Sequence, residues 1–311
     1  MRAVVMREFG PPSVLEPAEM AEPGAGPGEV VIEAEFVNVT FVETQIRAGR
    51  APHPSMLPAL PVILGNGTGG TVAGRRVVAS LNGTGGYAER VAVDARRLIE
   101  APDGVPLRDA VALLADGRTA LSLVGRAGLR AGETVLVEAA AGGVGTLLVQ
   151  LARQAGARVV ALAGQPGKLA LARDLGADLA VDYSHGDWPG QVRAAAGQVD
   201  VVFDGVGGEV GRAAFGLLGA GGRFYPFGMA SGSFAPVTPE LAQEHGVTVL
   251  RGGPADAEES AELSRTALAE AAAGRLRPVI GQEFDLARAS AAHAAIEARA
   301  TIGKTLLTVP R

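Results

Sequence analysis

Hydrophobic and polar positions divide the chain into three stretches. Up to about residue 113, short apolar or alternating runs at 30–37, 76–80 and 87–93 are separated by loops rich in glycine and proline. Runs of this kind predict β-strands of an irregular, barrel-like domain. From 106 to 126 the spacing of apolar residues predicts a helix that leads into the next stretch.

The middle stretch alternates apolar strands with helices. The predicted strands are 134–139, 158–163, 179–181, 199–204 and 222–227, and the predicted helices are 144–155 and 168–175. Because strands alternate with helices, we expect a parallel sheet that is covered on both faces. The last stretch predicts two alanine-rich helices at 258–273 and 287–299 and a strand at 305–309, and we expect this tail to pack against the first domain.

Composition and charge narrow the classes of function. The chain has 311 residues, of which 48% are hydrophobic and 20% are charged, and this length fits two domains. A net charge of −5 offers no electrostatic footprint for nucleic acid. No apolar run approaches the roughly 18 residues that span a membrane, and the N-terminus becomes polar too early for a signal peptide. We therefore expect a cytoplasmic protein without nucleic-acid or membrane partners.

The segment from Ala140 to Gly145 carries the clearest chemical signal. Ala140, Gly142 and Gly145 occupy the three small-residue positions of a G-x-G-x-x-G motif. The motif is weak alone, but here a buried strand precedes it and a helix follows it. Small residues let the backbone approach a pyrophosphate closely, and the N–H groups of the helix N-terminus hold its charge. The segment therefore predicts a dinucleotide site rather than a plain strand-to-helix turn.

The second predicted strand indicates NADPH rather than NADH. Enzymes that use NAD place an acidic residue about 20 positions after the motif, where it binds the ribose 2′-hydroxyl. Here the strand ends in Ala163-Gly164-Gln165, and Lys168 follows at the start of the next helix. A lysine suits a 2′-phosphate as a point charge, and Tyr183 ends the next short strand within reach of the same pocket. A solvated Lys168 and a packing Tyr183 are the alternatives.

Several segments taken together resemble one known family. In chain order they are 41–49, 86–89, 139–145, the spacing from Lys168 to Tyr183, 204–208, 227–228, and 293–304 with His293, Glu297, Arg299, Thr301, Gly303 and Lys304. Their order and spacing resemble the zinc-independent quinone oxidoreductases of the medium-chain dehydrogenase/reductase superfamily, the group that includes zeta-crystallin. The resemblance covers nearly the whole chain.

The resemblance implies the domain organisation and the cofactor contacts. It implies an α/β fold in which a Rossmann domain, at 114–250, interrupts a GroES-like β-barrel catalytic domain made of 1–113 and 251–311. It also implies a homodimer, with NADPH in a cleft. The residues that would bind the cofactor are Thr119, Ala140, Gly142, Gly143, Val144, Gly145, Gly164, Lys168, Tyr183, Gly205, Val206, Phe227, Gly228 and Lys304.

The sequence offers no metal site. The chain has no cysteine, and its four histidines show no ligand spacing. Where zinc-dependent relatives carry Gly-His-Glu, this chain reads Gly65-Asn66-Gly67. We therefore expect hydride transfer to depend on positioning and hydrogen bonds rather than on zinc.

The predicted catalytic residues are Thr40, Gln45 and Arg47. Each can donate a hydrogen bond to the oxygen of a quinone or α,β-unsaturated carbonyl that gains charge as hydride arrives. Relatives often carry asparagine in place of Thr40 and tyrosine in place of Gln45. A second tyrosine, the proton donor of related enoyl-thioester reductases, aligns near Ala51 and is missing. Arg47 has the alternative role of organising its own loop.

Three functions therefore remain open from the sequence. The first is an NADPH-dependent reductase of quinones or α,β-unsaturated carbonyls, which is favoured because a quinone can take its protons from water. The second is a reductase of enoyl-thioesters or natural-product intermediates on the same fold. The third is an NADPH-binding protein without turnover, which the altered residues at 40, 45 and 51 keep open.

Overall fold

The computed structural model describes residues 1–252 and 256–310, and the chain forms two compact units. Unit 1 comprises residues 1–118 and 260–311, and unit 2 comprises residues 119–259. The domain limits expected after 113 and 250 fall inside helix α2 (Leu107–Ala127) and just before helix α8 (Ala257–Ala272). Within the expected segment 251–311, residues 253–255 and 311 lie outside the described residues.

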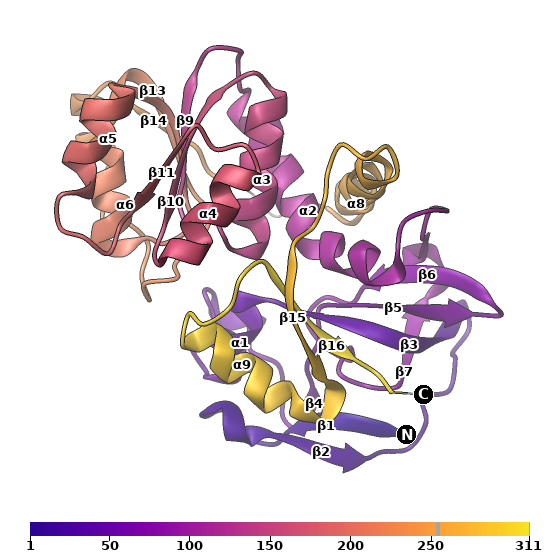
Figure 1. Ribbon diagram of the computed structural model, residues 1–311. Coiled ribbons are helices and arrows are strands. Elements are labelled where there is room, and N and C mark those ends of the chain that lie inside the picture. The colour runs from indigo at the N-terminus through magenta and orange to yellow at the C-terminus, as the bar shows by residue number, and fades with distance from the viewer. Residues whose placement is uncertain (253–255, 311) are drawn as a thin grey trace. The chain divides into compact units, whose positions relative to one another are not determined.

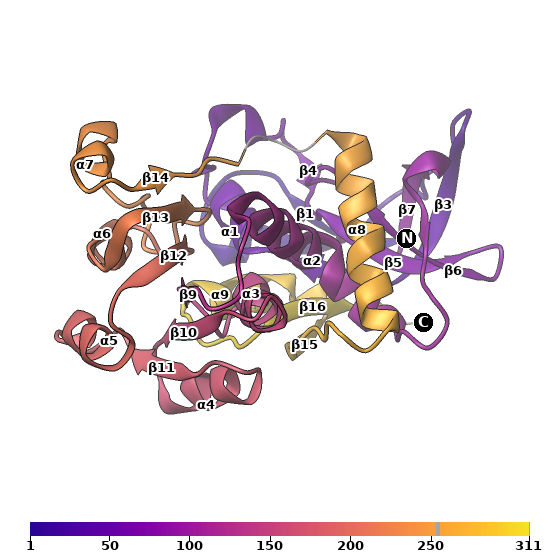
Figure 2. The ribbon, with the colours of Figure 1, turned by 90° about the horizontal axis from the view of Figure 1, so that it is seen from above.

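Unit 2 contains a six-stranded parallel sheet with the order β11-β10-β9-β12-β13-β14. The strands are β9 (Thr134–Val137), β10 (Arg158–Ala163), β11 (Leu179–Asp182), β12 (Val199–Asp204), β13 (Leu218–Pro226) and β14 (Thr248–Val249). Figure 2 shows them side by side in this order. Numbered along the chain, the order is 3-2-1-4-5-6, which is that of a dinucleotide-binding Rossmann fold. The predicted α/β doubly wound sheet is therefore confirmed.

Helices cover both faces of this sheet. They are α3 (Gly143–Gln154), α4 (Pro166–Asp174), α5 (Trp188–Ala196), α6 (Gly208–Phe215) and α7 (Pro239–Glu244). Figure 1 shows α3 and α4 on one face and α5 and α6 on the other. The central strands are apolar on both faces because each face is covered, and Val201, Val202 and Phe203 are fully buried. The two-residue strand β14 was not predicted, since so short a run carries no periodicity.

Unit 1 is built mainly of antiparallel strands in two sheets. The larger has the order β15-β16-β3-β5-β6-β8 with β7 paired to β3, and the smaller has the order β2-β1-β4. The strands are β1 (Arg2–Met6), β2 (Leu15–Glu19), β3 (Glu29–Val39), β4 (Val62–Ile63), β5 (Gly67–Val72), β6 (Arg75–Ser80), β7 (Arg90–Asp94), β8 (Ile99–Glu100), β15 (Ile280–Asp285) and β16 (Lys304–Thr308).

Two further α-helices and four short 3₁₀ helices complete the elements named in unit 1. The α-helices are α1 (Phe41–Arg47) and α9 (Ala289–Glu297), beside residues 107–118 of α2 and 260–272 of α8. The 3₁₀ helices are η1 (Pro12–Val14), η2 (Pro54–Met56), η3 (Ala95–Arg97) and η4 (Leu286–Arg288). The C-terminal tail packs against the first stretch as expected, because β16 pairs antiparallel with β3 and buries Leu306 and Leu307. Helix α1 was not predicted from the apolar pattern.

β5 and β6 form a hairpin with a two-residue turn. Val72 pairs with Arg75, so that only Ala73 and Gly74 form the turn. Both have positive φ, at 49° and 77°, as the twist of a two-residue hairpin requires. Residues beyond these two are not needed to reverse the chain, so the turn is as short as a hairpin allows.

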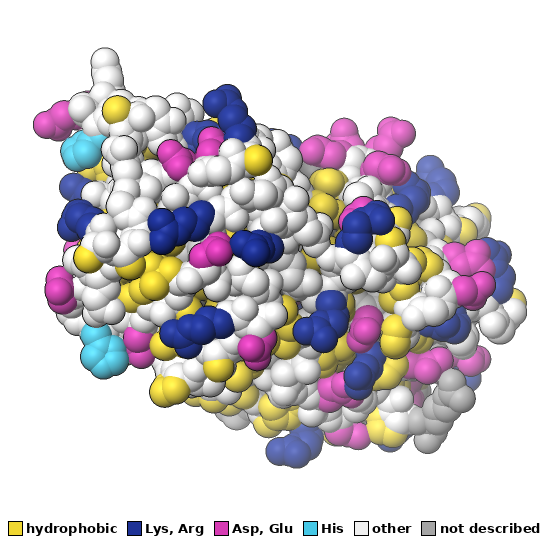
Figure 3. All heavy atoms as spheres, turned by 45° about the horizontal axis from the view of Figure 1, so that its top comes forward, with side chains coloured by type: hydrophobic (Ala, Val, Ile, Leu, Met, Phe, Trp, Pro, Cys, Tyr) yellow, Lys and Arg dark blue, Asp and Glu magenta, His cyan; other side chains and the backbone are white. Residues whose placement is uncertain are grey.

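Charged side chains of both signs are interspersed on the face of the molecule drawn in Figure 3. None of the helices that the structure describes is both long enough and apolar enough to cross a membrane.

Gly70 gives a direct test of the β3–β5 pairing in unit 1. A Cβ atom at Gly70 would lie 1.9 Å from the carbonyl oxygen of Glu33, so the strands must separate to admit it. We expect Gly70→Ala to lower the free energy of unfolding by at least about 2 kcal/mol, measured by urea denaturation. The matched control is Gly24→Ala, because a Cβ there meets nothing within 4 Å and should change stability little. Equal stability of the two variants would contradict this packing.

Candidate cofactor and catalytic sites

Most of the predicted cofactor residues follow the carboxyl ends of strands in unit 2. Ala140 to Gly145 come after β9, Gly164 after β10, and Tyr183 directly after β11. Gly205 and Val206 follow β12, and Phe227 and Gly228 follow β13. Because the strands are parallel, these segments meet at one edge of the sheet, where ligands of such sheets bind. Thr119 differs, since it lies on α2 rather than after a strand.

The segment between β9 and α3 has the geometry of a phosphate site. Gly142 is the N-cap of α3, and no side chain caps the helix there. The first N–H groups of a helix have no acceptor within the helix, so they are available to an anion. A Cβ at Gly145 would lie 2.2 Å from the carbonyl oxygen of Ala139, so only glycine permits this close approach of helix and strand. The residues present therefore fit a dinucleotide pyrophosphate.

The end of β10 has the features that a 2′-phosphate requires. Gly164 is partly exposed, and a Cβ added there would meet nothing within 4 Å. Lys168 is the third residue of α4, so it lies at the start of a helix, as expected from the sequence. It is partly buried. Tyr183 packs against the core of unit 2 and its N–H donates to the carbonyl of Ala163 at 3.4 Å. No acidic residue stands between Ala163 and Lys168.

The segments after β12 and β13 are joined by backbone contacts. The N–H groups of Phe227 and Gly228 donate to the carbonyl of Asp204 at 2.9 and 3.1 Å. The Phe227 ring lies against Gly205, because a Cβ at Gly205 would be 2.9 Å from the Phe227 Cζ. Gly205 and Val206 are buried, whereas Phe227 and Gly228 are partly exposed. The two segments thus form one connected wall of the predicted nicotinamide end.

Two buried carboxyl groups lie beneath this wall. Glu138 follows β9 and Asp204 ends β12, and the side chains of both are fully buried. The Val206 N–H lies 3.1 Å from Glu138 Oε2 and also 3.1 Å from Asp204 Oδ1, and the Gly207 N–H donates to Asp204 Oδ1 at 2.6 Å. Burial raises the pKa of Glu138 well above its usual range, and the nearby Asp204 raises it further.

Thr40 and Glu43 form a buried polar pair at the start of α1 in unit 1. The Thr40 N–H and Oγ1 donate to Glu43 Oε2 at 2.5 and 2.7 Å, and the Asn66 N–H donates to Glu43 Oε1 at 2.8 Å. Glu43 is fully buried, and its desolvation raises its pKa to about 7 against the opposing effects of these hydrogen bonds and of Lys304. Thr40 is partly exposed, so a partly exposed residue contacts the buried acid.

Lys304, predicted to bind the cofactor, is the first residue of β16. Its ammonium donates to Asp116 Oδ1 at 3.0 Å, and its side chain is only 4% exposed. Thr305 pairs with Val39, which places Lys304 opposite the start of α1, and its charge lowers the pKa of Glu43. Lys304 therefore belongs to a buried charge cluster with Asp116 and Glu43.

The other two predicted catalytic residues, Gln45 and Arg47, are buried within α1. The Gln45 amide nitrogen donates to the Thr44 hydroxyl at 3.1 Å. The Arg47 guanidinium donates to the carbonyl of Gly10 and forms an ion pair with Glu297. Arg47 is thus committed to partners within unit 1, and this geometry favours the organising role that the sequence analysis left open for it.

The buried histidine of unit 1 is also committed to a structural contact. His293 Nε2 lies 2.9 Å from the Tyr87 hydroxyl, and both side chains are fully buried. Burial lowers the pKa of His293 to about 3, with a further contribution from Arg47, so the imidazole is neutral. His53 is exposed. Among residues 1–252 and 256–310, no group of three or more His, Asp or Glu side chains is arranged to hold a metal ion.

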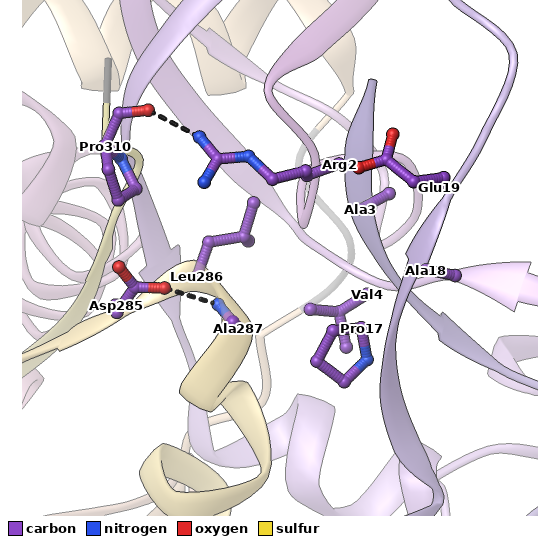
Figure 4. Close-up of a pocket in the computed structure, with 10 residues that line it drawn as sticks. All are labelled: Arg2, Ala3, Val4, Pro17, Ala18, Glu19, Asp285, Leu286, Ala287 and Pro310. Carbon is purple, nitrogen blue, oxygen red and sulfur yellow. Dashed lines mark hydrogen bonds between the residues drawn. The ribbon is translucent and has the colours of Figure 1, made fainter.

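A separate pocket of about 220 Å³ lies in unit 1 (Figure 4). Its walls include Val4, Pro17 and Leu286, and its rim carries Arg2, whose guanidinium donates to the carbonyl of Pro310 at 2.8 Å. None of the predicted site residues lines it. The pocket is therefore no part of the predicted cofactor or catalytic sites.

Several polar residues that the fold brings to these sites were not predicted from the sequence. Glu43, Asp116 and Glu138 were not among the predicted site residues. The spacing of Thr40 and Glu43 is that of a helix capping box, a signal that was available from the sequence. Glu138 interrupts an otherwise apolar strand before the glycine-rich loop, and such a buried acid also signals a special environment.

Comparisons with known proteins agree with this arrangement. Residues 143–267 match the family model described as zinc-binding dehydrogenase. Quinone oxidoreductase of Pseudomonas aeruginosa is 32% identical over 96% of this chain and 97% of its own. The 2-haloacrylate reductase of a Burkholderia species is 30% identical over 99% of this chain and 98% of its own. The structure of quinone oxidoreductase from Thermus thermophilus, also solved with NADPH, matches with a TM-score of 0.87 and 36% identity over 99% of this chain and 100% of that one.

These similarities extend over nearly the entire chain and therefore include the residues of both units. They confirm the resemblance found in the sequence, including the GroES-like nature of the catalytic domain. The chain belongs to the zeta-crystallin-like quinone oxidoreductases of the medium-chain dehydrogenase/reductase superfamily.

Proposed function

We propose that the protein is a zinc-independent, NADPH-dependent reductase of quinones or α,β-unsaturated carbonyl compounds. The observation that carries the proposal is the meeting of glycine-rich segments after β9, β10, β12 and β13 at one edge of a parallel sheet, with Lys168 and no acid after β10. The NADPH complex of the Thermus thermophilus relative supports the choice of cofactor.

The cofactor contacts follow from these segments. Gly142, Gly143, Val144 and Gly145 would hold the pyrophosphate, and Gly164, Lys168 and Tyr183 would surround the 2′-phosphate. Gly205, Val206, Phe227 and Gly228 would lie against the nicotinamide end, with Thr119, Ala140 and Lys304 completing the set. When bound, NADPH supplies a hydride to an electron-poor carbon.

Thr40 is the residue that we propose donates to the acceptor oxygen. Thr40 is partly exposed, while Gln45 and Arg47 are buried. When Glu43 is ionised, it accepts a hydrogen bond from the Thr40 hydroxyl. When Glu43 is neutral, its own O–H can donate to Thr40 Oγ1, and the Thr40 hydroxyl is then available to donate to the acceptor oxygen. Since the pKa of Glu43 is about 7, the state of the donor changes near neutral pH. Gln45 and Arg47 would support Thr40 by holding α1 in place.

An alkene acceptor is the second candidate, covering enoyl-thioesters and natural-product intermediates. It is favoured by the Burkholderia relative named as a 2-haloacrylate reductase, which matches this chain over nearly its full length. The missing tyrosine at Ala51 disfavours the proton-donor mechanism of related enoyl-thioester reductases. A protein that binds NADPH without turnover is the remaining alternative. We also propose that the protein is a homodimer in the cytoplasm and that its domain limits are those given by the resemblance.

An acceptor screen tests the proposed reaction. We expect purified protein to oxidise NADPH, followed by its absorbance, with 9,10-phenanthrenequinone or 1,4-benzoquinone, and to act more slowly with crotonyl-CoA. Faster turnover of crotonyl-CoA would favour the enoyl-thioester alternative. Tight NADPH binding without oxidation by any of the three acceptors would favour the binding protein.

Lys168 tests the choice of cofactor. We expect Lys168→Ala to raise the Kd for NADPH about 10- to 100-fold, since a hydrogen bond to a charged group contributes about 1.5–3 kcal/mol. The Kd for NADH should stay nearly unchanged, because NADH has no 2′-phosphate. Lys168→Arg keeps the charge and serves as the control. Similar losses for both cofactors would remove Lys168 from the phosphate site.

Thr40 tests the proposed donor. We expect Thr40→Val to lower kcat/KM roughly 10- to 100-fold at pH 6.5, because removal of one donor from a developing oxyanion has an effect of about this size or larger. Thr40→Ser keeps the hydroxyl and should retain most activity. In the unaltered protein kcat/KM should fall as pH rises through about 7, as Glu43 ionises. Thr40→Val should lose this dependence on pH, and an unchanged pH profile in that variant would show that Glu43 does not act through Thr40.

A further inference from the structure

The two carboxyl groups of Glu138 and Asp204 lie at a special point of the sheet in unit 2. β9 and β12 are adjacent in the sheet, although α3, β10, α4, β11 and α5 separate them in the chain. The order of strands reverses between them, and ligands of such sheets bind outside the strand ends at this point. Neither acid is among the residues that the proposed function requires, so their burial at this place needs another explanation.

Backbone hydrogen bonds draw both acids to the segment after β12. The Val206 N–H lies 3.1 Å from an oxygen of each acid, and the Gly207 N–H lies 2.6 Å from the Asp204 oxygen. The first turn of α6 closes over the other side of Asp204, since a Cβ at Gly211 would be 2.6 Å from Asp204 Oδ2. Both carboxyl groups are therefore fixed in position, and neither can turn away from the other without breaking these bonds.

One oxygen of each acid is left without a donor. Glu138 Oε1 and Asp204 Oδ2 are buried and accept no hydrogen bond from the N–H or O–H groups of the described residues. The two side chains are within hydrogen-bonding reach of each other. Two ionised carboxylates so placed would repel, whereas one proton held between them gives both acids a partner.

The surroundings indicate which acid carries that proton. Asp204 accepts two backbone N–H groups and faces the N-terminus of α6, both of which favour its ionised form. Glu138 accepts only one backbone N–H group. Burial and Asp204 raise the pKa of Glu138, and within the described residues no other ionisable side chain contributes to the shift of either acid.

We propose that Glu138 is a positioning residue that stays protonated, donates to Asp204, and thereby holds the segment Gly205–Gly208 in place for the cofactor. The protonated acid joins the segment after β9, which holds the phosphate site, to the segment after β12. Glu138 acts through Asp204 and the Val206 N–H, and it touches neither cofactor nor substrate. The part of this inference that concerns the cofactor rests on the proposed contacts of Gly205 and Val206.

Glu138→Gln separates this role from a merely structural one. The glutamine amide can donate to Asp204 and accept from the Val206 N–H, so it reproduces the protonated acid, but it does not titrate. The matched control is Asp200→Asn, which removes another carboxylate from β12, one that accepts the Thr134 N–H at 2.7 Å at the opposite end of the strand.

Stability of the protein without cofactor gives the first measurement. The pKa of Glu138 is higher in the folded than in the unfolded chain, so the folded state binds the extra proton at any pH between the two values. Stability must therefore fall as pH rises from about 4.5, the value for the unfolded chain, to the folded pKa. Relative to Glu138→Gln, the folding equilibrium constant of the unaltered protein should fall by up to about tenfold per pH unit in this window. Asp200→Asn should keep the slope of the unaltered protein, and parallel curves for the protein and Glu138→Gln would overturn the proposal.

NADPH binding gives the second measurement, and it needs no acceptor. The Kd for NADPH is measured by the fluorescence of the bound dinucleotide. In the unaltered protein we expect this Kd to rise toward alkaline pH, as Glu138 loses its proton. A rise of about tenfold corresponds to a shift of one pH unit in the pKa of Glu138 when NADPH binds. In Glu138→Gln this dependence should be absent. The same rise in the variant would overturn the cofactor part of the proposal. Loss of the proposed reaction would look different, since NADPH would bind normally while no acceptor was reduced.

An infrared spectrum of the unaltered protein keeps the proposal testable if Glu138→Gln fails to fold. At pH 8.5 Glu43 is mostly ionised, because its pKa is about 7. A carbonyl band of a buried neutral carboxylic acid at this pH therefore supports the shared proton, and where Glu138→Gln folds the band should disappear. Absence of the band from the unaltered protein at pH 8.5 would overturn the proposal.

Discussion

Desolvation of buried ionisable groups is the physical constraint on which the sites of both units depend. A charge that loses its water must be paired, accept hydrogen bonds, or become neutral. Lys304 is paired with Asp116 and Arg47 with Glu297, whereas Glu43 and Glu138 have raised pKa values. The same constraint makes His293 neutral beside Tyr87. Each of these groups therefore holds backbone segments together in a way that apolar packing alone does not specify.

The two proposed proton-holding acids have different surroundings and different roles. Glu43 accepts from the partly exposed Thr40 and has a pKa near neutrality. Both properties suit a group that controls whether the Thr40 hydroxyl can donate to the acceptor in the proposed reaction. Among the described residues, the partners of Glu138 are Asp204 and one backbone N–H, and its side chain is fully buried. The proton that we assign to Glu138 touches neither cofactor nor substrate, so its contribution is to shape rather than to chemistry. Position in the fold, and not residue type, separates these two roles.

Local pattern was sufficient for most elements of unit 2 and insufficient for much of unit 1. Strand 158–163 and strand 199–204 were predicted with their observed bounds, because both are mostly apolar runs between loop residues. Helix α1 was missed, since five of its seven residues are buried and most of those are polar, so it has no apolar face to recognise. The expected strand 134–139 ends at Val137 because Glu138 and Ala139 turn toward the phosphate segment, with Ala139 at a φ of 48°.

The sequence by itself determined the Rossmann-type unit, the dinucleotide segment and the family, because these depend on local periodicity and on the spacing of small residues. It also pointed to Lys168 and to the missing acid that together indicate NADPH. Only the tertiary structure decided that Arg47 pairs with Glu297, that Lys304 pairs with Asp116, and that Glu138 meets Asp204. The residues of each pair are 66 to 250 positions apart in the chain. No local pattern encodes such contacts, because they form only when the fold brings distant helices and strand ends together.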